Sequence, residues 1–170
     1  MSNHSLRYPT VLFDWGDTVM HDYPEITTPM VEWKTIEVID GIAEVLAYLH
    51  ASGRQIILAT SAAISNEEQI WGALKRCGLD TYFSHIYCFK NTNLSKGETF
   101  YRHILSDLNI PASDVLMVGD SFEKDVQTPN VLGMFAVWFN LRSQEIRSDE
   151  LHFTVHSMAQ LKEFFESLDK

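Results

Sequence analysis

The chain has 170 residues, a length that fits a single domain with one continuous hydrophobic core. Hydrophobic residues make up 45% of the chain and charged residues 21%, as in ordinary globular proteins, and no apolar run approaches the roughly 18 residues of a membrane helix. A formal net charge of −10 without a Lys/Arg cluster disfavours a nucleic-acid partner, although a bound divalent cation would still admit a small phosphorylated substrate.

The N-terminal segment and the cysteines bear on the cellular compartment. The stretch MSNHSLRYPT lacks the charged start and the apolar run of a secretory signal. The two cysteines, Cys77 and Cys88, fall in different predicted elements and do not have the spacing of metal ligands. We therefore expect reduced thiols, a cytoplasmic location and no membrane partner.

Five short apolar runs predict buried strands, because β-branched and aromatic residues dominate them. They span residues 11–13, 56–59, 86–89, 115–118 and 135–139. Between these runs, apolar residues recur at i, i+3, i+4 and i+7 from Ile42, Ile70 and Tyr101, which predicts amphipathic helices. A last helix is expected from Ser157, and Pro129 should interrupt the helix that follows residue 120.

The alternation of strands and helices predicts the fold class. Strand–helix–strand units form right-handed crossovers, so the strands lie parallel and the helices cover both faces. We expect one α/β domain over residues 1–170, a three-layer Rossmann-like fold with a mostly parallel central sheet. In such sheets, ligands bind beyond the carboxyl ends of the strands, so the polar residues found there are the candidates for function.

Polar residues follow three of the predicted strands. A carboxylate can attack phosphorus, paired carboxylates bind Mg²⁺, and a lysine and a hydroxyl can hold phosphoryl oxygens. The strand ends therefore predict phosphoryl transfer. They carry Asp14-Trp15-Gly16-Asp17-Thr18, Thr60-Ser61, and Asp120-Ser121 with Asp125, while Lys96 opens the helix before the fourth strand.

Several of these residues have an ordinary alternative explanation. Asp120 and Ser121 could cap the following helix, Thr60 could be a turn hydroxyl, and Lys96 could be a solvated lysine. Asp14 is harder to explain in this way, because it ends an apolar strand and a buried carboxylate needs a partner. The combination of residue types at successive strand ends is what favours a functional site.

At these residues the sequence resembles the haloacid dehalogenase-like (HAD) superfamily, from about residue 8 to residue 168. VLFDWGDTV at 11–19 is similar to its first motif, Thr60 lies in the second, Lys96 in the third, and MVGDSFEKD at 117–125 is similar to the fourth. The resemblance implies a hydrolase with Mg²⁺ as cofactor and an aspartyl-phosphate intermediate on Asp14. It implies metal ligation by Asp14, the Gly16 carbonyl, Asp120 and Asp125, catalysis by Asp14 and Lys96, and substrate contacts from Trp15, Thr60, Ser61 and Lys96.

Gly16 departs from the family pattern. Phosphatases of the superfamily carry a second aspartate at that position, which protonates the leaving group and then activates water. General acid–base catalysis is typically worth about 10²–10⁴-fold in rate. We expect Asp17 to compensate in part and Gly16→Asp to speed turnover. The alternatives are substrates with good leaving groups, such as acyl phosphates, or a protein specialised for phosphate binding or phosphotransfer.

Other functions rank below a phosphatase. A non-catalytic phosphate-binding relative would keep the fold and the acids. Phosphonoacetaldehyde hydrolases also have a small residue at the position of Gly16, but they use a lysine of the cap, and here only Lys34 lies between residues 19 and 40. Haloacid dehalogenases need a large cap. A response-regulator-like domain would place its acids in a different strand order.

The spacing between motifs leaves no room for a separate cap domain. A short lid at about residues 20–37 is expected instead, and its aromatic residues, such as Trp33, are more typical of packing than of ligand binding. An open site of this kind suits a bulky substrate or closure by a neighbouring subunit of a homo-oligomer. The acidic surface argues against nucleic acid as that substrate.

Overall fold

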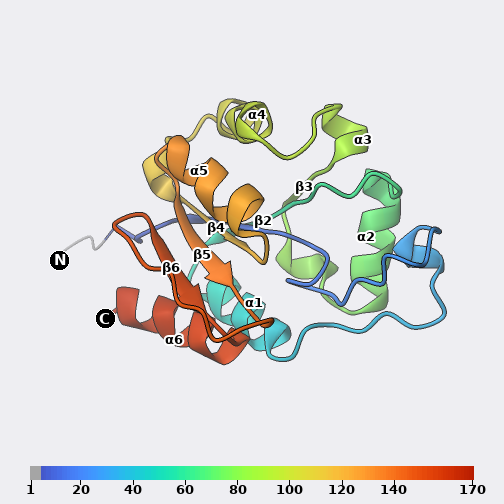
Figure 1. The fold of residues 1–170 in the computed structure, drawn as a ribbon, viewed down its shortest axis with the longest axis horizontal. Coiled ribbons are helices and arrows are strands. Elements are labelled where there is room, and N and C mark those ends of the chain that lie inside the picture. Colours follow the sequence, from blue (N-terminus) through green and yellow to red (C-terminus); the bar gives the residue numbers. More distant parts are fainter. Residues whose placement is uncertain (1–4) are drawn as a thin grey trace.

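A six-stranded parallel sheet forms the centre of the computed structural model, which describes residues 5–170 (Figure 1). The strand order is β3-β2-β1-β4-β5-β6, and every neighbouring pair is parallel. Residues 1–4 of the predicted domain lie outside the described part. The strands are β1 (Thr10–Phe13), β2 (Gln55–Ala59), β3 (His85–Tyr87), β4 (Val115–Gly119), β5 (Phe135–Phe139) and β6 (His152–Val155).

Helices connect these strands. A π-helical stretch, Phe122–Gln127, leads directly into α5, and short 3-10 turns lie at Met30–Glu32, Asp80–Tyr82 and Ala112–Asp114. Among the described residues, no helix is both long and apolar enough to cross a bilayer. The α-helices are α1 (Ile42–Ala51), α2 (Glu67–Arg76), α3 (Phe89–Thr92), α4 (Glu98–Leu108), α5 (Thr128–Val131) and α6 (Met158–Leu168).

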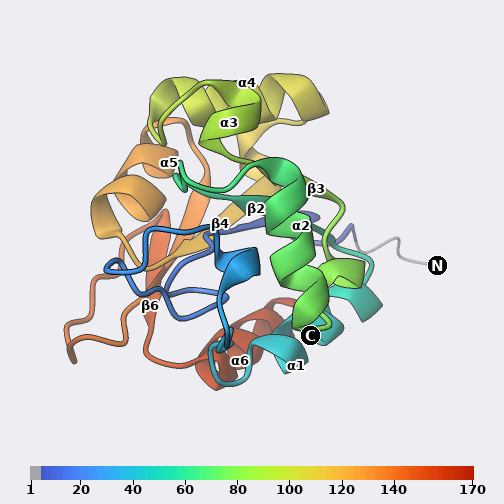
Figure 2. The ribbon, with the colours of Figure 1, turned by 90° about the vertical axis from the view of Figure 1, so that its right-hand side faces the viewer.

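The two faces of the sheet bury different side chains, because successive residues of a strand point to opposite sides. Val11 and Phe13 of β1 join the core under α1, α2 and α6, whereas Leu12 joins the core under α4 and the π-helical stretch. Figures 1 and 2 show α1 and α6 on one side of the sheet and α4 and α5 on the other. The predicted Rossmann-like α/β fold is confirmed, and residues 5–170 contain no separate cap domain.

The structure corrects the predicted elements at two places. The edge strand β6 was not expected, and it extends the sheet by pairing with β5. Phe89 was expected to end a strand, but it begins α3, because the Asn91 side chain accepts the Cys88 N–H at 2.8 Å and turns the chain there. Near Pro129 the helix changes type and is not broken: the π-helical stretch ends at Gln127, and α5, which carries Pro129 in its first turn, follows without a gap.

The two ends of the predicted lid, residues 20–37, are joined to each other, and its middle is bound to α2. Met20 forms a bridge with Val38, which joins the beginning of the lid to the residue that follows it. The Arg76 guanidinium of α2 donates to the Trp33 carbonyl at 2.6 Å. Trp33 is buried, as expected for a packing residue. The lid is therefore an ordered part of the fold, and its path is set by contacts with two other segments.

Candidate active site

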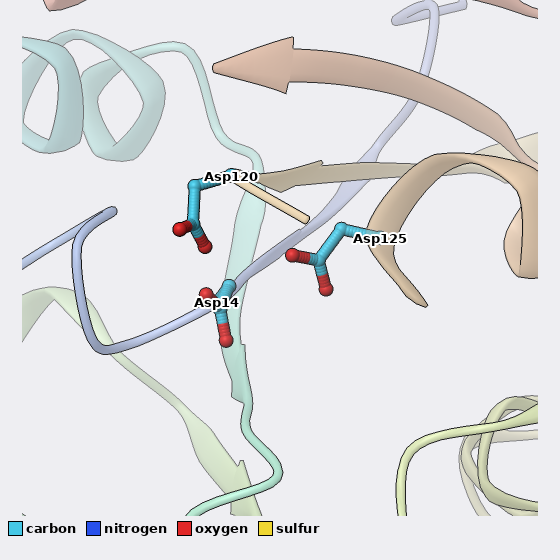
Figure 3. A group of neighbouring side chains, drawn as sticks. All are labelled: Asp14, Asp120 and Asp125. Atoms are coloured by element: carbon cyan, nitrogen blue, oxygen red, sulfur yellow. The ribbon is translucent and has the colours of Figure 1, made fainter. Parts of the chain in front are cut away.

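Three carboxylates meet at the carboxyl end of the sheet, where β1 and β4 lie side by side. Asp14 follows β1, and its N–H donates to the Val118 carbonyl of β4 at 2.9 Å. Asp120 follows β4, and Asp125 comes from the π-helical stretch. One oxygen of each carboxylate lies within 4.8 Å of the others. Figure 3 shows the three side chains turned toward one common space.

Lys96 lies between two of these carboxylates. Its Nζ is 2.8 Å from Asp14 Oδ1 and 2.8 Å from Asp125 Oδ1, and its side chain is only 2% exposed. Burial disfavours the ammonium, but the charges of Asp14 and Asp125 outweigh that effect and raise the pKa of Lys96. The side chain is a fixed positive charge, so the alternative of a solvated lysine is wrong. Lys96 precedes Gly97, the N-cap of α4, by one residue.

Asp125 is held by the main chain as well as by Lys96. Its Oδ2 accepts the Ser121 N–H at 3.0 Å, and the residue is 1% exposed. A Cβ at position 119 would collide with this carboxyl, so Gly119 leaves the space that Asp125 occupies. Ser121 is also the N-cap of the π-helical stretch, with its hydroxyl accepting the Lys124 N–H at 3.3 Å. The capping alternative is therefore correct for Ser121.

The carboxylates carry more negative charge than Lys96 can offset. Burial and then the neighbouring Asp14 raise the pKa of Asp120 to about 8. Burial raises the pKa of Asp125 to about 6, against the opposing effect of Lys96. A cluster that resists full ionisation in this way is stabilised by a further cation. Carboxylate oxygens are the ligands that Mg²⁺ prefers, so the donor set fits a divalent ion.

A cavity of about 470 Å³ opens beside the carboxylates. The site residues predicted from the sequence all line this cavity: Asp14, Trp15, Gly16, Asp17, Thr60, Ser61, Lys96, Asp120 and Asp125. The lid supplies another part of the wall, from Asp22 to Trp33. Residues of the lid thus line the same cavity as the acids.

Thr60 and Trp15 are oriented by local contacts. The Thr60 hydroxyl accepts the Ala62 N–H at 3.0 Å, which is the turn interaction considered as its alternative role. The hydroxyl can still donate its own proton to a phosphoryl oxygen. The Trp15 indole is buried and donates to the Met20 sulfur at 3.1 Å. Both side chains therefore have structural partners in addition to their place in the cavity wall.

Asp17 lies in the loop after β1 and has an uncommon backbone conformation. Asp17 has φ +59°, a left-handed conformation that aspartate tolerates better than most residues. Its Oδ1 accepts the Asp22 N–H at 3.0 Å, and its Oδ2 lies 3.5 Å from the Arg142 guanidinium. The carboxylate of Asp17 thus connects the β1 loop to the lid and to a basic side chain.

Sequence reasoning missed three charged residues at this site. Asp22 from the lid and Lys124 from the π-helical stretch line the cavity, and the Arg142 guanidinium lies 3.7 Å from Asp120 Oδ2. Partial burial of its carboxyl and then the charge of Asp17 raise the pKa of Asp22, although the residue as a whole is exposed. No motif contains Asp22 or Arg142, and their positions depend on how two loops return to the sheet.

A family comparison decides the affiliation of the chain. Residues 11–139 match the family model described as haloacid dehalogenase-like hydrolase. The chain belongs to this family. The resemblance found in the sequence motifs is therefore confirmed, and the carboxylate cluster lies where the first and fourth motifs of this HAD-like hydrolase come together.

Two curated relatives of this HAD-like hydrolase are named glyceraldehyde 3-phosphate phosphatase. The one from Pyrococcus abyssi is 26% identical over 102 residues, which are 59% of this chain and 42% of that protein. The one from Methanocaldococcus jannaschii is 23% identical over 158 residues, 88% of this chain and 68% of that protein. The match thus spans less than half the length of the Pyrococcus protein.

A solved structure of an uncharacterized protein from Listeria monocytogenes serotype 4b is similar over almost the full length. The TM-score is 0.79 with 23% sequence identity, and the match covers 94% of this chain and 98% of that chain. At this level of identity the likeness shows the fold. It agrees with the six-stranded parallel sheet described above.

Proposed function

We propose that this HAD-like hydrolase is a Mg²⁺-dependent phosphohydrolase that works through an aspartyl-phosphate on Asp14. The observation that carries the proposal is the buried bridge in which Lys96 Nζ lies 2.8 Å from both Asp14 and Asp125. A carboxylate held by a permanent positive charge, beside two further acids and an open cavity, can attack an anionic phosphoryl group.

Asp14 is the proposed nucleophile. Lys96 donates to its Oδ1 at 2.8 Å and Thr18 donates to its Oδ2 at 3.3 Å, so its carboxylate is held in one orientation. Such positioning lowers the entropic cost of reaching the in-line geometry. Attack of the Asp14 carboxylate on phosphorus forms an acyl phosphate and breaks the bond to the leaving group, and Lys96 offsets the negative charge that gathers there.

Asp14, Asp120, Asp125 and the Gly16 carbonyl are the proposed ligands of the metal. When bound, Mg²⁺ supplies positive charge and a fixed orientation for the phosphoryl oxygens. Asp125 also accepts hydrogen bonds from Lys96 Nζ and the Ser121 N–H, so its carboxylate fixes the position of Lys96 within the cluster.

Thr60 and Ser61, which follow β2, are the proposed phosphate-binding residues, with the Thr60 hydroxyl as a donor. Both line the cavity, as does Trp15, the third proposed substrate contact. Asp17 is the acid–base group that the sequence predicts in place of the usual side chain at Gly16, and this role stays a prediction. The cavity, with a volume of about 470 Å³, has room for more than a phosphate group.

The proposed substrate is a small phosphorylated molecule. The phosphatase names of the two curated relatives favour a phosphoric monoester, and Gly16 favours leaving groups that need little acid assistance, such as acyl phosphates. The net charge of −10 disfavours nucleic acid, and a homo-oligomer is one arrangement that would cover the open cavity.

A second candidate is a phosphate-binding or phosphotransfer protein with slow turnover. The specific observation in its favour is Gly16, which provides no side chain for acid–base chemistry. In that case Asp14 would become phosphorylated and stay so, because no group would activate water against the acyl phosphate. Single-turnover and steady-state measurements distinguish the two candidates.

Phosphate release from 4-nitrophenyl phosphate, acetyl phosphate and glyceraldehyde 3-phosphate, with Mg²⁺ or with EDTA, tests the proposal. We expect release that requires Mg²⁺ and disappears in Asp14→Asn. Glu163→Gln, the same change at an exposed carboxylate of α6, is the matched control and should keep full activity. Turnover that persists in Asp14→Asn would contradict the proposal, and one equivalent of product without further turnover would favour the second candidate.

A further inference from the structure

The lid places a carboxyl directly beside Gly16, the position that has no side chain for acid–base chemistry. A Cβ built on Gly16 would lie 3.1 Å from Asp22 Cβ and 3.4 Å from both Asp22 Cγ and Asp22 Oδ2. Asp22 therefore borders the space that an aspartate side chain at position 16 would enter. It also lines the same cavity as Asp14. The chain thus lacks a carboxyl at position 16 and has one beside that position from a different segment.

Main-chain contacts hold Asp22 in this position. The Asp22 N–H donates to Asp17 Oδ1 at 3.0 Å. Met20, two residues earlier, forms β-bridges with both Gly16 and Val38. These contacts tie the beginning of the lid to the β1 loop, so the location of the Asp22 carboxyl follows from the fold. A catalytic group needs such support, because small displacements cost large factors in rate.

Asp17 is less well placed for proton transfer than Asp22. One of its carboxylate oxygens accepts the Asp22 N–H, and the other faces the Arg142 guanidinium at 3.5 Å. Both oxygens of Asp17 therefore already have a partner within the protein, whereas the proton of a general acid must reach the leaving group. Asp17 is therefore suited to positioning the lid.

We propose that Asp22 is the general acid–base residue of this enzyme and that Asp17 is a positioning residue for it. The proposal rests on the phosphohydrolase function proposed above. In the first step the Asp14 carboxylate attacks phosphorus, the bond from phosphorus to the leaving oxygen breaks, and the Asp22 carboxylic acid gives its proton to that oxygen. In the second step the Asp22 carboxylate takes a proton from water as the water oxygen attacks phosphorus. Asp14 is then released as a carboxylate, together with inorganic phosphate.

The dependence of rate on the leaving group tests this assignment. A proton donor matters most for a poor leaving group, so Asp22→Asn should slow turnover of phenyl phosphate by about 10²–10⁴-fold. Formation of the intermediate from 4-nitrophenyl phosphate should slow far less, and the variant should show a burst of about one equivalent of nitrophenolate. Glu163→Gln, the same change at an exposed carboxylate of α6, should show neither change. Asp17→Asn keeps an oxygen that can accept the Asp22 N–H, so any loss of rate should be equal for the two esters.

Exchanging the residues at positions 16 and 22 gives a second test, with activity on phenyl phosphate as the measurement. Gly16→Asp alone places its new Cβ 3.1 Å from Asp22 Cβ, a tight contact beside a second carboxyl, so it should bring less gain than the sequence alone suggests. Asp22→Gly should lose the activity with phenyl phosphate. The double variant Gly16→Asp/Asp22→Gly removes the contact and places a carboxyl at position 16, so its activity should be at least tenfold higher than that of Asp22→Gly.

The outcomes separate failure of this proposal from failure of the proposed function. If the wild type shows no Mg²⁺-dependent and Asp14-dependent turnover of either ester, the phosphohydrolase function itself is wrong. If the wild type turns over both esters and Asp22→Asn matches it on phenyl phosphate, the assignment of Asp22 is overturned. An Asp17→Asn variant that shows the leaving-group effect in place of Asp22→Asn would assign the role to Asp17.

Discussion

Replacing Lys96 by methionine removes the only buried positive charge that the described residues place between Asp14 and Asp125. Methionine has a similar volume, so the change acts mainly on electrostatics. Removing one partner of a buried ion pair costs about 3–5 kcal/mol, because the remaining charge is left uncompensated. For a domain of 170 residues, about 1 kcal/mol shifts Tm by roughly 2–4 °C, so Tm should fall by roughly 10 °C.

Urea denaturation in EDTA at pH 7.5 measures this loss, with Lys34→Met as the control at an exposed lysine. The double variant Lys96→Met/Asp125→Asn should be more stable than Lys96→Met alone, because the second change removes an orphaned charge. A Lys96→Met protein within about 0.5 kcal/mol of the wild type would refute this reasoning, because surface substitutions typically have effects of that size. Destabilisation by Asp125→Asn in the Lys96→Met background would refute it as well.

Three further predictions concern the same cluster. Gly119→Ala should displace the Asp125 carboxyl, lowering stability by about 1–3 kcal/mol and activity at least tenfold, as measured by urea denaturation and phosphate release. Asp120 has a pKa of about 8 against its ordinary 3.8, so its contribution to the stability of the metal-free protein is present below pH 4 and lost as the pH rises toward 8. Asp120→Asn should therefore raise the free energy of unfolding in EDTA by about 1–2 kcal/mol at pH 8.5, after allowance for solvent screening, but not at pH 4, while it abolishes activity. Mg²⁺ at 10 mM should raise the wild-type Tm by a few degrees through binding to the folded state, and should leave the Tm of Asp120→Asn unchanged.

Local patterns in the sequence were sufficient to predict most of the sheet. A local signal also marks the start of α2, where Asn66 and Gln69 form a capping box: Asn66 Oδ1 accepts the Gln69 N–H at 2.8 Å and Gln69 Oε1 accepts the Asn66 N–H at 2.9 Å. The edge strand β6 was missed for a physical reason. It stands at the edge of the sheet beside β5 and leaves Phe153 40% exposed, so its sequence is not the continuous apolar run of a central strand.

The convergence of Asp14, Lys96 and Asp120 could be predicted because parallel topology brings strand ends to one edge. The place of Asp22 could not be predicted in this way. It depends on the bridge between Met20 and Val38, which returns the lid past the β1 loop, and no local pattern encodes that pairing. Arg142 was missed for the same reason, since it lies beyond β5 in a loop whose path carries no periodic signal.

Chemical trapping of the phosphorylated aspartate is the most direct test of the proposed mechanism. The enzyme is mixed with Mg²⁺ and acetyl phosphate, quenched with borohydride, which reduces an acyl phosphate to the alcohol, and digested for mass spectrometry. The mechanism predicts homoserine at position 14, formed with Mg²⁺ and absent in EDTA. An unmodified Asp14 in a sample that is releasing phosphate, or a reduced carboxyl at any other position, would contradict it.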